Sequence, residues 1–161
     1  MFPCFRAASL GTALALFTVR TSSAQAVSVD EPYVYLLCNA TSFNQDTRSQ
    51  LHAYGSDPDT LSLLITVTES WMTSAGDDCL LLGTSAQNQW DYIVHYGLQG
   101  ARMAQPDATR YLYQSAGPVR FILKYPQRGL YRFTLHREQG AFSITEVNAE
   151  AKWRPLVDSN H

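Results

Sequence analysis

The stretch that decides the fold runs from Val119 to Val147 and reads VRFILKYPQRGLYRFTLHREQGAFSITEV. Apolar and polar residues alternate along three of its segments, which is typical of strands that bury one face only. Glycine-bearing turns at residues 126–129 and 138–140 separate these segments. Short alternating strands at even spacing, joined by such turns, predict an antiparallel three-stranded meander.

The residues that precede this stretch repeat the pattern. Residues 60–68 (TLSLLITVT) place apolar side chains on one face and mostly hydroxyl side chains on the other. Further strands are expected at residues 32–38, 51–54, 79–82 and 90–96. No part of residues 27–161 has the clear 3.6-residue periodicity of an amphipathic helix. The sequence therefore predicts an all-β fold, an antiparallel immunoglobulin-like β-sandwich of about seven or eight strands.

Two segments are expected to lie outside these strands. Residues 97–117 form the longest stretch without clear periodicity, and such stretches are often functional loops or contain a short helix. Residues 27–31 are expected to be a frayed start of the domain.

The beginning of the chain has the features of a secretory signal peptide. Arg6 supplies a positive charge, residues 7–19 are apolar, and residues 24–26 (AQA) form a small-residue cleavage site. The apolar stretch is shorter than the roughly 20 residues that a bilayer requires. We therefore expect a cleaved signal at residues 1–26, a folded domain at residues 27–147, a tail at residues 148–161, and a periplasmic or secreted protein.

Two cysteines remain after this cleavage, because Cys4 lies within the signal segment. Cys38 and Cys79 allow one intramolecular pairing, and disulfides persist in exported proteins. We expect a disulfide between them. Two buried free thiols are the alternative.

The charge of the chain argues against two classes of partner. The net charge is −2, and the signal segment contains arginines but no acidic residue, so the remainder is more acidic still. Nucleic acids and anionic membranes both attract clusters of Lys and Arg. We expect no nucleic-acid binding and no membrane insertion after signal cleavage.

Catalytic and metal-binding motifs are missing from residues 27–161. No Gly-x-Ser-x-Gly or Cys-x-x-Cys occurs, and no two histidines have metal-ligand spacing. Asp57, Asp59, Asp77 and Asp78 lie in turn-like sequence, where Asp usually bonds its own backbone. We expect a protein that is not an enzyme, with no cofactor and no metal.

Three features resemble a known family. Phe43-Asn44 follows the first expected strand, Trp90 lies mid-chain, and residues 125–133 (YPQRGLYRF) contain a turn and a Gly-x-Tyr-x-Phe strand. Together they resemble the early-set, immunoglobulin-like sandwiches of starch- and glycogen-binding modules, over residues 32–147. Those modules have a Phe-Asn-x-Trp turn, and here Gln45 and Asp46 follow Phe43-Asn44, so the tryptophan is absent. The resemblance implies a sandwich fold and a carbohydrate ligand.

Aromatic residues beside amides are the candidate ligand-binding residues. A flat aromatic ring packs on the apolar C–H face of a sugar, and amides form hydrogen bonds with its hydroxyls. The candidates are Phe43, Asn44, Asn88, Trp90, Tyr92, Tyr111 and Tyr113. For Trp90 and Tyr92 the alternative is a core stripe along one face of a strand.

A second candidate surface is cationic. Arg120, Lys124, Arg128 and Arg132 are expected to form a strip on the outer face of the last hairpin. Such a strip would suit an acidic partner or glycan. The alternative is a solvated face that discourages edge pairing.

These observations favour a non-catalytic binding module for a saccharide or a cell-envelope glycan. The alternative is a periplasmic interaction protein, either an accessory subunit or an inhibitor, which would use residues 97–117. A hydrolase ranks third, because it would need two carboxylates to meet in a cleft.

Overall fold

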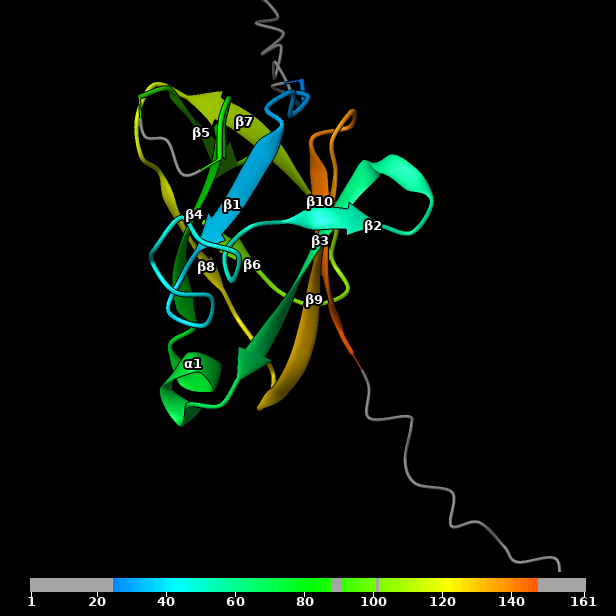
Figure 1. Cartoon of the computed structure of the whole chain (residues 1–161). Coiled ribbons are helices and arrows are strands. Elements are labelled where there is room, and N and C mark those ends of the chain that lie inside the picture. Colours follow the sequence, from blue (N-terminus) through cyan, green and yellow to red (C-terminus); the bar gives the residue numbers. More distant parts are fainter. Residues whose placement is uncertain (1–24, 88–90, 101, 148–161) are drawn as a thin grey trace, which may run out of the picture.

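A computed structural model describes residues 25–87, 91–100 and 102–147 (Figure 1). These residues form an all-β structure with mostly antiparallel strands and one short helix, as the alternation predicted. The strands are β1 (Tyr33–Leu37), β2 (His52–Tyr54), β3 (Asp57–Val67), β4 (Asp77–Thr84), β5 (Ile93–Leu98), β6 (Met103–Ala104), β7 (Arg110–Ser115), β8 (Arg120–Leu123), β9 (Gly129–His136) and β10 (Ala141–Glu146). The helix α1 (Ser70–Ser74) connects β3 to β4.

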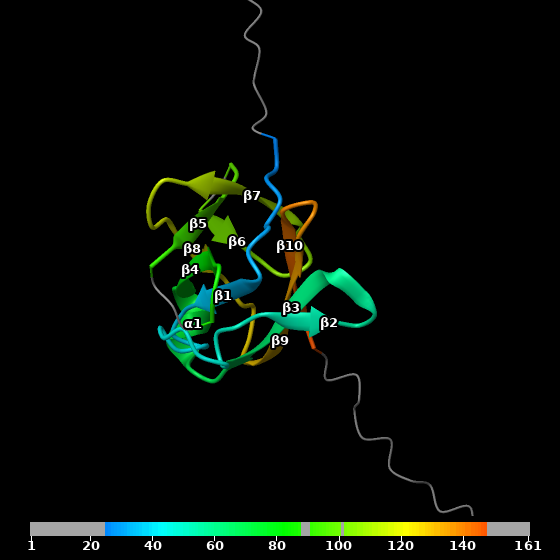
Figure 2. The same ribbon diagram turned by 45° about the horizontal axis from the view of Figure 1, so that its top comes forward.

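The strands form two halves that are joined through β7. Hydrogen bonding follows the order β2-β3-β9-β10-β7-β5-β4-β8-β6, and β1 pairs with β4. The first part of β7, Arg110 and Tyr111, pairs with β10, whereas residues 112–115 pair with β5. Figure 2 shows β7 running between β5 and β10, and Figure 1 shows β2, β3, β9 and β10 on one side of the molecule.

The core lies between these two halves. Phe142 of β10 stacks on Phe133 of β9 with ring centroids 4.7 Å apart, and it also meets Phe121 of β8 at 5.9 Å. Phe121 comes from the other half, so Phe142 contacts both. All three rings are buried, and truncating such a ring typically costs about 3–5 kcal/mol. The alternation in the sequence therefore exists because each half buries one face against the other.

The predicted three-stranded meander is wrong at its first strand. The β9 and β10 strands form the expected hairpin, but β8 pairs with β4 and β6 in the opposite half. The connection turns sharply after Tyr125, whose ring packs on Tyr131 at 4.9 Å, while the Tyr131 hydroxyl donates a hydrogen bond to the Gln127 carbonyl at 2.7 Å. Alternation shows that β8 buries one face, but it does not show which strand lies beside it.

The expected loop at residues 97–117 contains strands. It includes the end of β5, the two residues of β6 and the whole of β7. Along β7 only Leu112 is fully buried, so a single core residue gave too little periodicity to reveal the strand. The strand expected at residues 90–96 begins instead at Ile93.

The expected frayed start at residues 27–31 is also wrong. The Val29 backbone N–H donates to the Arg137 carbonyl at 3.0 Å, and Arg137 Nε donates to the Val29 carbonyl at 2.9 Å. Val29 is buried, and the Tyr96 hydroxyl donates a hydrogen bond to the Glu31 carboxylate. These long-range contacts fix the segment, and its local sequence gave no sign of them.

No helix among the described residues has the length and hydropathy that a membrane span would need. Residues 1–24, which belong to the predicted signal segment, and the predicted tail at residues 148–161 lie outside the described residues.

Candidate functional site

An open groove of about 610 Å³ lies in the described part of the chain. It lies between the loop of residues 39–48 and the outer face of β2, β3 and β9, and we call it the β3 groove. Two other hollows, of about 360 and 470 Å³, are smaller. The β3 groove is lined by Asn39, Ala40, Thr41, Ser42, Thr47, Arg48, His52, Ser62, Leu63, Leu64, Thr66 and Arg132.

The alternation of β3 builds the floor of this groove. Leu63 and Ile65 are buried in the core, and therefore Ser62, Leu64 and Thr66 point outward. Leu64 is 49% exposed, which is unusual for a leucine in the middle of a sheet. The Leu64 side chain therefore presents an apolar surface between the hydroxyl-bearing residues Ser62 and Thr66.

Neighbouring strands add polar side chains to this floor through their register. Leu64 pairs with Arg132 of β9, and Ser62 lies between Thr134 of β9 and His52 of β2. Side chains at directly opposed positions of an antiparallel pair lie about 4.5–5.5 Å apart at Cβ. The register therefore places a cation directly beside the exposed leucine.

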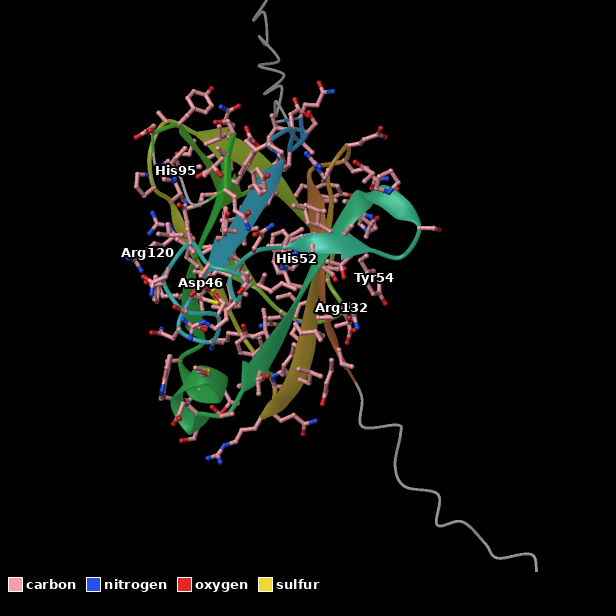
Figure 3. The ribbon with its side chains drawn as sticks, viewed as in Figure 1. Asp46, His52, Tyr54, His95, Arg120 and Arg132 are labelled. Carbon is pink, nitrogen blue, oxygen red and sulfur yellow. The ribbon has the colours of Figure 1, made fainter. Side chains whose placement is uncertain are left out.

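Arg132 is held in place by Tyr54. The guanidinium carbon lies 4.2 Å from the centroid of the Tyr54 ring, within the range of a cation–π contact. The register of β2 shifts between Ala53 and Tyr54, and Tyr54 remains 45% exposed. Figure 3 shows His52, Tyr54 and Arg132 together beside β2, with Asp46 and Arg120 on the other side.

The charge of the groove is positive and only partly compensated. Its lining includes Arg48, His52 and Arg132 but no Asp or Glu. Arg48 is bound to Asp46 at 2.8 Å, and this hydrogen-bonded ion pair lowers the pKa of the Asp46 carboxyl. Among the described residues, no carboxylate lies within salt-bridge distance of Arg132.

Buried polar groups hold the loop that forms the other wall. The fully buried Asp77 carboxylate accepts hydrogen bonds from the Asn39 backbone N–H at 3.0 Å, the Asn39 amide at 2.9 Å and the Ala40 backbone N–H at 2.9 Å. The Thr41 hydroxyl donates to the Leu36 carbonyl at 2.5 Å. The loop wall is therefore fixed by interactions in the interior of the protein.

Beside this anchor lie the two cysteines. The Sγ atoms of Cys38 and Cys79 and an Asp77 carboxylate oxygen all lie within 4.8 Å of one another. In this structure both cysteines are free and buried, and burial raises the pKa of the Cys79 thiol well above its usual value. Such a trio could hold a metal ion, but both Asp77 oxygens already accept N–H groups of the loop. The cluster is therefore best explained as structural.

The aromatic candidates from the sequence do not line the β3 groove. Phe43 is 39% exposed on the side of the loop that faces β8, where the Arg120 guanidinium lies 5.7 Å from its ring centroid. Asn44 is exposed and contacts only Ser42 through its side chain. Asn88 and Trp90 lie outside the described residues.

The tyrosine candidates lie on β7, which joins the two halves, and just before β5. Tyr111 and Tyr113 share the outer face of β7 rather than a loop, and Tyr111 is 48% exposed. The Tyr113 ring covers Gly97, where an added Cβ would lie 2.6 Å from the ring. Tyr92 precedes β5 and is 64% exposed, so it does not belong to a core stripe.

The predicted cationic strip is divided between the two halves. Arg120 of β8 forms a salt bridge with Asp78 at 2.8 Å, whereas Arg132 of β9 lines the β3 groove. The division follows from the pairing of β8 with β4. Of the groove residues, only Arg132 belonged to a surface that the sequence singled out. The contribution of β2 could not be predicted, because this strand is short and the positions of its side chains depend on a bulge.

No protein-family model, no curated protein and no solved structure matches this chain.

Proposed function

We propose that this chain is an exported, non-catalytic binding module that holds a saccharide in the β3 groove. The observation that carries the proposal is the composition of the groove. An exposed apolar side chain, Leu64, lies beside the hydroxyl-bearing Ser62 and Thr66, and the loop that lines the groove contributes the polar residues Asn39 and Ser42.

This arrangement is complementary to a pyranose ring. Such a ring has an apolar C–H face and a rim of hydroxyls, each of which can donate and accept hydrogen bonds. Leu64 would contact the C–H face, and the side chains of Asn39, Ser42, Ser62 and Thr66 would bond the rim.

The same lining supports a role without catalysis. Glycoside hydrolysis usually requires two carboxyl groups about 5–10 Å apart on either side of the scissile bond. The β3 groove has no carboxyl group in its lining, and the cysteines lie buried beneath the loop. Binding is therefore a better explanation of the groove than hydrolysis.

The proposal includes an immunoglobulin-like sandwich and a Cys38–Cys79 disulfide. Two packed halves that share one core support a β-sandwich. The pairing of β1 with β4 ends at Leu37 and Leu80, next to the two cysteines, and the Cys38 and Cys79 Sγ atoms lie within 4.8 Å of each other, which supports the proposed disulfide. Export through a cleaved signal would supply the oxidising compartment.

A glycan array that includes neutral glucans, oligouronides and peptidoglycan fragments tests the proposal. The best ligand is then titrated by calorimetry against Leu64→Ala and Tyr111→Ala. Tyr111 is a matched control, because it is equally exposed and does not line the groove. We expect Leu64→Ala to weaken binding about tenfold, equivalent to about 1.4 kcal/mol, and Tyr111→Ala to bind as the wild type.

Two outcomes would overturn the proposal. Loss of binding in Tyr111→Ala alone would move the site to the face of β7. If no glycan on the array binds, a saccharide ligand is rejected and the second candidate, a protein partner, is favoured. The observation behind that second candidate is the exposure of Tyr92 and Tyr111, since exposed tyrosines are enriched in protein interfaces.

A further inference from the structure

We propose that the saccharide bound in the β3 groove carries a carboxylate, and that Arg132 is the residue that recognises it. This inference rests on the proposed function. It adds the chemical class of the ligand. The hydroxyls and the single leucine of the groove would not by themselves distinguish a neutral sugar from an acidic one.

The charge of Arg132 is unpaired. Arg48 binds Asp46, Arg120 binds Asp78, and Arg137 donates to the carbonyls of Val29 and Glu31. The other described arginines, at positions 102, 110, 128 and 132, have no such partner, and of these four only Arg132 lines the β3 groove. Within the described part of the chain, Arg132 has neither a carboxylate partner nor a hydrogen-bond acceptor. Its N–H groups are available to a ligand, in a chain whose net charge is negative.

The guanidinium of Arg132 is also held by an aromatic contact. Its carbon lies over the Tyr54 ring, 4.2 Å from the ring centroid, and this cation–π contact limits the positions that the guanidinium can take. Because the N–H groups of arginine lie in its plane, a face that is covered by an aromatic ring leaves the donating edge free. A carboxylate accepts two parallel hydrogen bonds from such an edge, which is the strongest pairing that arginine makes.

Arg132 also lies beside Leu64. The two residues are paired across β3 and β9, and both line the groove. A pyranose that rests on Leu64 would direct a ring substituent toward the adjacent guanidinium. Therefore a sugar with its carboxylate attached to the ring fits better than a neutral sugar. His52, which lies opposite Ser62, provides a further donor on the same floor.

The groove also argues for a sugar acid rather than a free small anion. A site for a small anion would surround it with several converging donors, whereas here one guanidinium lies at the side of an apolar and hydroxyl-rich floor. The carboxylate can come from a uronic acid or from the lactyl ether of muramic acid. A uronic acid holds its carboxyl carbon one bond from the ring, and muramic acid holds it three bonds away through an ether oxygen. Both present a carboxylate beside a pyranose, so the experiment must separate the two sources.

The experiment compares ligands that differ only in charge. An oligogalacturonide and its fully methyl-esterified form are titrated by calorimetry into the mature protein, and a muramic acid disaccharide with a free lactyl group forms a second arm. We expect the free acid to bind at least tenfold more tightly than its ester. We also expect this preference to shrink with added salt, because exposed charges are screened. Binding in only one arm identifies the source of the acid.

Three variants assign the preference to Arg132. Arg132→Gln is expected to bind acid and ester equally. Arg132→Lys keeps the aliphatic stem but loses the planar fork, and is expected to retain only part of the preference. Arg120→Gln removes an arginine that lies over an aromatic ring on the other side of the loop, and is expected to behave as the wild type. Circular dichroism and Tm show that each variant is folded.

The outcomes separate this inference from the function on which it rests. If the wild type binds the ester as tightly as the acid, the ligand class is wrong while saccharide binding stands. If the preference persists in Arg132→Gln, another residue recognises the acid and the assignment is wrong. If neither form binds and the glycan array is silent, the proposed function fails as well.

Discussion

Asp77 and Asn39 are joined by two hydrogen bonds to one carboxylate oxygen, from the Asn39 backbone N–H at 3.0 Å and from its side-chain amide at 2.9 Å. Asp77 opens β4 and is fully buried, whereas Asn39 begins the loop that forms one wall of the β3 groove. A buried carboxylate is stable only where donors satisfy it, and here the loop supplies those donors. The shape of the groove is therefore coupled to one interior residue.

The first prediction concerns Asp77→Asn. The amide keeps the shape of the side chain, but it has no charge and one of its two ends donates rather than accepts. At least one N–H of Asn39 or Ala40 would then be unpaired in the interior. We expect a loss of about 3 kcal/mol in the free energy of unfolding, measured by urea denaturation.

Asp78→Asn is the matched control for this substitution. Asp78 is the next residue and forms a salt bridge with Arg120, but its side chain is about half exposed. We expect a loss below about 1 kcal/mol, because exposed ion pairs contribute little. Equal effects of the two substitutions would show that the loop is not anchored at Asp77.

The second prediction concerns the two cysteines. If Cys38 and Cys79 are paired in the exported protein, alkylation under denaturing conditions without reductant should modify neither. Reduction should lower the free energy of unfolding by about 4 kcal/mol, because the bond closes a long loop in the unfolded chain. Recovery of two alkylated thiols from protein purified out of an oxidising compartment would contradict the pairing.

The sequence predicted the strands with strong alternation and failed where pairing depends on distant residues. β3, β9 and β10 each bury every second residue, and this period was readable without a structure. β8 has the same period, yet it lies in the other half. β7 buries only Leu112 completely, so its sequence contains no repeat of buried residues from which a strand could be predicted.

The candidate site was harder to predict, for a related reason. Aromatic residues such as Tyr111 attract notice one at a time, whereas the β3 groove is assembled from small polar residues on three strands and a loop. Leu64 in particular belongs to an apolar run, and only the register shows that it faces outward beside Arg132. The sequence did not reveal the groove, because the groove depends on which strands pair and in which register. A local sequence pattern does not contain that information.

The third prediction concerns Gly140, in the turn between β9 and β10. Its φ is +54°, and an added Cβ would collide with the Val27 carbonyl. Gly140→Ala would therefore combine backbone strain with displacement of the segment at residues 27–31. We expect a loss of about 2–3 kcal/mol and faster amide exchange at Val29.

Gly55→Ala separates these two contributions. Gly55 has a similar positive φ of +74°, but nothing lies within 4 Å of an added Cβ. We expect a loss of about 1 kcal/mol and unchanged exchange at Val29. If both alanine variants lose the same stability, the packing of the first residues of the domain on the hairpin contributes nothing measurable.

The fourth prediction concerns the pH dependence of stability through His95. This residue lies on β5 between Leu82 and Ser115, and its Nδ1 is buried without a hydrogen-bond partner among the described residues. Desolvation by burial lowers the pKa of the imidazole below its usual 6.5. The unfolded chain therefore binds a proton at His95 more readily than the folded chain does.

The sign of the effect follows from that difference. Above pH 6.5 the imidazole is neutral in both states and contributes no pH dependence. As the pH falls through 6.5 toward the lower pKa of the folded state, protonation favours unfolding, so stability decreases. The urea midpoint of the wild type should fall more between pH 7.5 and pH 5.5 than that of His95→Gln, which has no titrating ring. An NMR titration gives a direct test, and a His95 midpoint at or above 6.5 in the folded protein would reject the prediction.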